Sequence, residues 1–145
     1  MSAWCISRYF LGSTVSITEA RRFVTTFLKG WPNVATAELI VSELATNAIR
    51  HSASGRFGGR FLVTIRGDAG RLWIAVLDEG GPGRPQIFPE YPDLEGGRGL
   101  RIVSEAASEW GVLGDHRGRT VWASLDDAAV DPNPANHSNA YRQGR

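Results

Sequence analysis

The chain has 145 residues, of which 42% are hydrophobic and 21% charged, and its formal net charge at pH 7 is +1. This length favours one domain with a substantial core and excludes a (β/α)8 barrel or a repeat array. The balanced charge argues against a protein held to nucleic acid by bulk electrostatics, and a single cysteine excludes an intrachain disulfide or a cysteine-based zinc site.

No signal-peptide pattern precedes the first apolar segment, and no apolar run approaches the roughly 18 residues of a membrane span. We therefore expect a cytoplasmic protein with neither a membrane nor a nucleic acid as its direct partner. Glycine is over-represented, at 17 of 145 residues against about 7% in average proteins. Two glycine clusters lie close together in the sequence: Gly80, Gly81 and Gly83, then Gly96, Gly97 and Gly99.

The first third of the chain predicts one strand and two helices. Residues 4–11 are short and apolar, which is typical of an edge strand. Ser16 and Glu19 have the spacing of a capping box, with Ser16 as the N-cap of a helix that the Gly30 and Pro32 region ends. A second helix is predicted over residues 34–51.

The middle of the chain predicts a hairpin followed by a long loop. Residues 61–65 and 72–77 are rich in β-forming side chains, and the turn residues 67–70 lie between them. Residues 80–95 contain four prolines and few apolar side chains, so we expect a loop there.

The last part predicts a helix, a second hairpin and a tail. Apolar residues recur at helical spacing over residues 99–110, and Gly111 is expected to end that helix. Residues 112–113 and 120–125 predict the closing hairpin. From Asp126 onward there is too little apolar surface to offset the entropy of ordering, which predicts a disordered tail over 126–145. We therefore expect residues 1–125 to fold as an α+β two-layer sandwich, with a mixed, mostly antiparallel sheet covered on one face by helices.

A polar stripe interrupts the largely apolar second helix. Glu43, Asn47 and Arg50 lie at i, i+4 and i+7, so their side chains share one side of the helix. The stripe predicts a buried helix facing a wet pocket. The alternative is a partly exposed helix whose charged side chains are solvated.

Two further features have the chemistry of a ligand site. Asp78 ends a fully apolar strand and precedes Gly80, so its carboxylate could accept a hydrogen bond from a buried ligand while the glycine lets the backbone approach. The alternative is an ordinary turn in which Asp78 caps local N–H groups. Gly96-Gly97-Arg98-Gly99 opens the third helix, where free N–H groups and the Arg98 charge favour an anion.

In this order, the motifs resemble those of the histidine-kinase-like (GHKL, or Bergerat-fold) ATPases, and most closely those of the actinobacterial anti-sigma-factor serine/threonine kinases. The matching segments are Glu43-Leu-Ala-Thr-Asn47, Asp78-Glu-Gly80, Gly96-Gly97-Arg98-Gly99-Leu100 and Gly118-Arg-Thr120.

The resemblance implies an ATP site that uses Mg2+. Asn47 would give its amide oxygen to Mg2+, and Glu43 would be the catalytic base. Asp78 would accept the adenine amino hydrogen, and Thr120 would support that contact. Gly80, which has no side chain, would leave space for the adenine ring.

The second glycine box would bind the rest of the nucleotide. Gly97, Arg98, Gly99 and Leu100 are implied to line the phosphate site, and residues 82–95 are implied to form a lid over ATP. Where family kinases tend to carry an arginine just before this box, the chain has Glu95.

The resemblance implies a kinase that phosphorylates Ser or Thr of a STAS-type anti-anti-sigma partner, with a sigma factor as a further partner and a homodimer as the assembly. Glu95, and Pro82 where a glycine is usual, keep a second hypothesis open: a non-catalytic ATP-responsive binding module. A third is the ATP-binding half of a split histidine kinase, whose phosphoacceptor helices another chain would supply.

Overall fold

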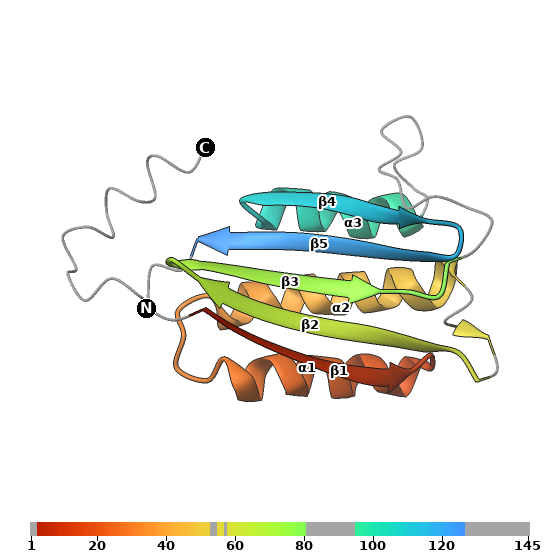
Figure 1. The fold of residues 1–145 in the computed structure, drawn as a ribbon, viewed down its shortest axis with the longest axis horizontal. Helices are drawn as coiled ribbons and strands as arrows, with labels where there is room; N and C mark the ends of the chain where they lie inside the picture. Colours follow the sequence, from red (N-terminus) through yellow and green to blue (C-terminus); the bar gives the residue numbers. More distant parts are fainter. Residues whose placement is uncertain (1–2, 53–54, 57, 81–94, 127–145) are drawn as a thin grey trace.

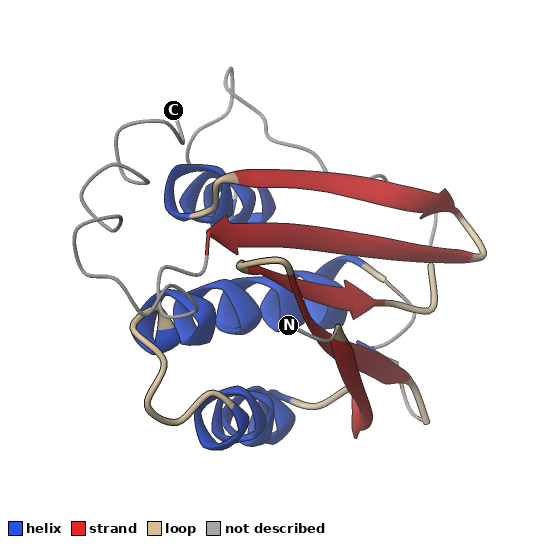
Figure 2. Cartoon of the chain, turned by 60° about the vertical axis from the view of Figure 1, so that its left-hand side comes forward, coloured by secondary structure: helices blue, strands red, loops and turns tan. Residues whose placement is uncertain are grey.

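In the part of the chain that the structure describes, the fold is a five-stranded sheet with three helices on one face (Figures 1 and 2). The structure is a computed structural model that describes residues 3–52, 55–56, 58–80 and 95–126, the side chains of residues 95–98 excepted. Within these ranges no helix combines the length and apolar composition needed to cross a bilayer. The elements are β1 (Trp4–Leu11), α1 (Thr14–Phe27), α2 (Val34–His51), β2 (Arg60–Asp68), β3 (Arg71–Leu77), α3 (Glu95–Ala106), β4 (Glu109–Asp115) and β5 (Gly118–Asp126).

The strand order is β1-β2-β3-β5-β4, and all four neighbouring pairs are antiparallel. The α+β sandwich is thus confirmed, and β1 is an edge strand as predicted. A two-residue turn joins β2 to β3, with positive φ at Ala69 (50°) and Gly70 (77°). This is the type I′ geometry, which matches the twist of the flanking strands.

Helix α2 occupies the centre of the helical layer. It packs against α1 and α3 on its two sides and against β2, β3 and β5 beneath it. Its buried residues include Ala37, Val41, Leu44 and Ala48. The core is therefore built around α2, and a polar side chain on this helix lies close to the sheet.

The prediction that Ser16 caps α1 is wrong. The helix begins at Thr14, with Ser13 in an extended N-cap conformation, and the Ser16 N–H donates to the Ser13 carbonyl oxygen at 3.0 Å. Ser16 is 4% exposed. Ser16 lies four residues before Ala20 and eight residues before Val24, so it shares their buried side of the helix. It therefore lies within the helix and cannot be its N-cap.

The predicted helix over residues 99–110 is displaced. Helix α3 begins at Glu95 and ends at Ala106, and Trp110 and Gly111 lie in β4 opposite Ala123 and Trp122. The Ser108 N–H donates to the Ser124 carbonyl oxygen at 2.8 Å, so pairing with β5 takes over immediately after the helix. Trp110 contacts the core from a strand, and its helical spacing to the preceding apolar residues is coincidental.

A row of side chains crosses the face of the sheet that no helix covers. In register across the five strands lie Tyr9, Leu62, Leu77, Thr120 and Leu113. Tyr9, Leu77 and Leu113 are exposed by 54%, 37% and 63%. Side chains alternate between the two faces along a strand. Since Arg119 and Val121 are buried on the helical side, Thr120 between them lies on the uncovered face.

Candidate functional site

Asp78 lies immediately after β3, on the helical face of the sheet, and is only 5% exposed. Its Oδ1 accepts hydrogen bonds from the backbone N–H of Gly80 at 2.6 Å and of Arg119 at 3.3 Å. The Asp78 N–H in turn donates to the Arg119 carbonyl oxygen at 2.8 Å. Within the described residues every hydrogen bond to this carboxylate goes to Oδ1, which leaves Oδ2 as an acceptor for a ligand.

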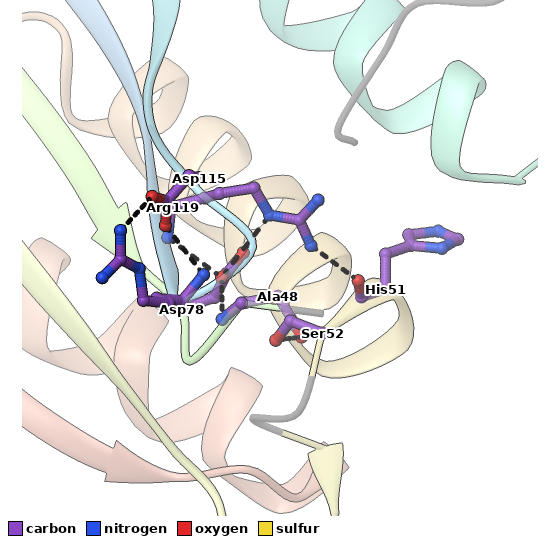
Figure 3. Close-up of polar contacts among 8 residues, drawn as sticks. Ala48, His51, Ser52, Asp78, Asp115 and Arg119 are labelled. Atoms are coloured by element: carbon purple, nitrogen blue, oxygen red, sulfur yellow. Dashed lines mark hydrogen bonds and ion pairs between the residues drawn. The ribbon is translucent and has the colours of Figure 1, made fainter. Parts of the chain in front are cut away.

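Arg119, at the second position of β5, is the charged neighbour of Asp78. Its side chain is 4% exposed, and its Nε lies 3.8 Å from Asp78 Oδ1. The guanidinium continues past the carboxylate and donates through Nη2 to the carbonyl oxygen of His51 at 2.9 Å. Figure 3 shows this chain of contacts, with the His51 imidazole turned away from the carboxylate.

Burial raises the pKa of the Asp78 carboxyl above its ordinary value, because desolvation disfavours the charged form. The Gly80 hydrogen bond and the positive charge of Arg119 act in the opposite direction. These contacts therefore favour the ionised acceptor in a place where water is largely excluded.

Gly80 is fixed by the turn between β4 and β5. Its φ is +76°, and a Cβ at this position would contact the His116 carbonyl oxygen and stand 2.8 Å from the carbonyl carbon of Arg117. Both the backbone conformation and the space exclude a side chain. This close approach positions the backbone that follows Asp78.

We expect Gly80→Ala to destabilise the fold much more than Gly30→Ala. Both glycines have positive φ, but a Cβ on Gly30 would meet nothing within 4 Å. The left-handed conformation alone costs about 1–2 kcal/mol, and the clash at Gly80 should add about 1–3 kcal/mol to the loss in the free energy of unfolding. Urea unfolding of the two variants measures the difference, and equal losses would contradict the backbone contact.

The polar stripe of α2 is partly buried. Asn47 is 6% exposed, Glu43 is half-buried and Arg50 is exposed. No group in the described part of the chain forms a hydrogen bond with the Asn47 amide. An amide oxygen is the kind of ligand that Mg2+ accepts, so that of Asn47 fits the role of a ligand to a cation.

Glu43 lies against the first turns of α3. A Cβ on Gly99 would stand 3.0 Å from Glu43 Oε2, so a side chain at residue 99 would press on the carboxylate. The structure thus brings Glu43 of α2 to one of the glycines of the second cluster. Gly99 is the fifth residue of α3, so Glu43 lies one turn beyond the N-terminal N–H groups that favour an anion.

The remaining predicted residues fall in three places. Leu100 is 1% exposed and belongs to the hydrophobic core, and the Thr120 side chain is not brought to Asp78 because it lies on the uncovered face. Gly97 and Arg98 are described only as backbone in α3. Residues 82–94 of the expected lid, and residues 127–145 of the expected tail, lie outside the described residues.

A family model described as "Histidine kinase-like ATPase domain" matches residues 12–125. The chain belongs to the histidine kinase-like ATPase family. The match spans every element from α1 to β5, which includes α2, the end of β3 and the start of α3. No curated protein matches the chain.

A solved structure has the same fold as this histidine kinase-like ATPase domain. It is the crystal structure of the RsbU and RsbW domains of Rv1364c from Mycobacterium tuberculosis, with a TM-score of 0.60 and 16% sequence identity. The alignment covers 84% of this chain but 32% of that one, so this chain spans about a third of the length of its neighbour. At this identity the likeness concerns the fold.

Arg119 is the site residue that sequence reasoning missed. The signal was present, because Arg119, Val121, Ala123 and Leu125 alternate with residues of the other face, and the last three are apolar. A period of two places Arg119 on the buried side of the strand. A buried arginine requires an anionic partner, and Asp78 is that partner.

Proposed function

We propose that this chain is an ATP- and Mg2+-dependent serine/threonine protein kinase of the anti-sigma type. Membership of the histidine kinase-like ATPase family makes it an ATP-binding domain. The observation that carries the finer proposal is the Glu43 carboxylate beside Gly99, because it brings a candidate base to the expected phosphate site.

In this proposal, Asp78 accepts the adenine amino hydrogen, and the first turn of α3 with Gly97, Arg98 and Gly99 holds the phosphates. Asn47 would hold Mg2+, whose charge neutralises the phosphate oxygens when it is bound. Glu43 takes the proton from a serine or threonine hydroxyl of the partner as that oxygen attacks the γ-phosphorus. The bond from the γ-phosphorus to the bridging oxygen breaks, and ADP leaves.

The proposed substrate is a small STAS-type anti-anti-sigma protein, with a sigma factor as a further binding partner and a homodimer as the working assembly. The fold shared with a chain that joins RsbU and RsbW domains supports a role in regulation. Incubating the purified chain with ATP, Mg2+ and each STAS-type protein encoded beside it tests the proposal, with a Ser/Thr→Ala partner as the control. Binding of ATP without transfer to any partner would favour the non-catalytic module instead.

We expect Asn47→Ala to abolish the dependence of ATP binding on Mg2+. Wild-type protein should bind ATP more tightly with Mg2+ than in EDTA, whereas the variant should bind it equally in both because the amide oxygen is gone. Calorimetric titration measures both affinities, and the EDTA series is the internal control for folding. A variant that still responds to Mg2+ would remove Asn47 from the metal site.

A further inference from the structure

Arg119 of β5 contacts two other parts of the fold, the end of β3 and the end of α2. Its main chain forms hydrogen bonds with Asp78 in both directions, and its guanidinium lies between the Asp78 carboxylate and the His51 carbonyl oxygen. His51 is the last residue of α2. A single side chain therefore connects the start of β5, the end of β3 and the end of the helix that carries Glu43 and Asn47.

Burying a guanidinium is costly unless it has an anionic partner and hydrogen-bond acceptors. Here the partner is Asp78, and the acceptor is a carbonyl at the C-terminus of α2, where the helix dipole favours a cation. The planar guanidinium can serve both at once, because its nitrogens diverge from one carbon. A lysine has a single nitrogen and could not reach both partners in this way.

The contacts with Arg119 also decide which carboxylate oxygen of Asp78 is used. Oδ1 receives the Gly80 and Arg119 N–H groups and lies 3.8 Å from the guanidinium Nε. Within the described residues no hydrogen bond is accepted by Oδ2. The rotation of the carboxylate about its Cβ–Cγ bond is thereby restricted from one side.

We propose that Arg119 is a positioning residue of the adenine site. It holds the Asp78 carboxylate so that Oδ2 meets the exocyclic amino group of adenine, and it connects this carboxylate to the last turn of α2. The inference rests on the proposed function in one respect, namely that Asp78 accepts that amino hydrogen. The contribution of Arg119 itself passes through Asp78 and not through a contact with the nucleotide.

The test compares ATP with purine riboside triphosphate, which differs only in lacking the exocyclic amino group. Wild-type protein should prefer ATP by about 10- to 100-fold, as expected for a hydrogen bond to a charged group. Arg119→Met should lower the affinity for ATP by about tenfold and leave the affinity for purine riboside triphosphate unchanged. Arg117→Met, on the neighbouring turn with a side chain 81% exposed, is the matched control and should behave as wild type.

A general loss of structure would weaken both nucleotides equally, so the ratio of the two affinities isolates the positioning role. Circular dichroism melting establishes whether Arg119→Met folds, and if it does not, Arg119→Lys takes its place with an expected severalfold loss of the ratio. A folded Arg119 variant that keeps the full preference for ATP would overturn the inference and leave the proposed function intact. If wild-type protein bound both nucleotides equally, Asp78 would not be the residue that recognises adenine, and the inference would fail with that assignment.

Discussion

Glu43→Gln should lower the rate of phosphoryl transfer to the partner by about 100-fold or more while leaving the affinity for ATP nearly unchanged. Glutamine keeps the shape and size of the side chain beside Gly99, but it cannot take a proton from the attacking hydroxyl. Single-turnover transfer of radiolabelled phosphate measures the rate, and calorimetric titration measures the affinity.

Glu38→Gln is the matched control for this prediction. It makes the same chemical change in the same helix, five residues earlier, and Glu38 does not belong to the polar stripe. Transfer should proceed at the wild-type rate in this variant. If Glu43→Gln transferred phosphate as fast as Glu38→Gln, Glu43 would not be the base and the catalytic part of the proposal would be lost.

Asp78→Asn should weaken ATP binding by about 10- to 100-fold, the range for a hydrogen bond to a charged group. The same change leaves the Arg119 guanidinium buried without its carboxylate, and breaking a buried pair from one side costs about 3–5 kcal/mol of unfolding free energy. The loss of ATP affinity and the loss of unfolding free energy both follow from removing the carboxylate, so both should appear in this variant. Titration with ATP and urea unfolding measure them.

Asp68→Asn provides the comparison, because Asp68 is an exposed aspartate at the β2–β3 turn. It should keep wild-type affinity and lose less than about 0.5 kcal/mol of stability, as is usual for a surface substitution. If the Asp78→Asn protein bound ATP with the same affinity as the Asp68→Asn protein, adenine would be recognised by another residue.

The elements could be located from the sequence wherever one signal dominated. Two runs of β-forming residues around the turn residues 67–70 located β2 and β3, and the long apolar pattern of α2 gave bounds that agree with the structure. Prediction failed where two signals were compatible with one segment. Ser13 and Ser16 can both act as N-caps, and Trp110 completes a helical pattern although it lies in a strand. Tertiary packing decided both cases.

The candidate site shows a similar division. Glu43 and Gly99 were expected to face one ligand, and the structure places them near one another, since a Cβ added to Gly99 would stand 3.0 Å from Glu43 Oε2. Alternation along β5 could place Arg119 on the buried side, but its pairing with Asp78 could not be identified in the same way, because the register of β5 against β3 determines which residues lie opposite one another. Residue 78 is 41 positions before residue 119, and no local pattern fixes a register over such a separation.

The position of β5 between β3 and β4 has a consequence for how the protein folds during synthesis. Strand β4 leaves the ribosome before β5, although β5 is its hydrogen-bonding neighbour in the sheet. Until then β3 presents an unpaired edge and Asp78 lacks the backbone and side chain of Arg119. A nascent chain that ends before β5 would therefore hold α2 and the first three strands without the Arg119 contacts of Asp78, and the proposed adenine site would be complete only after β5 is inserted.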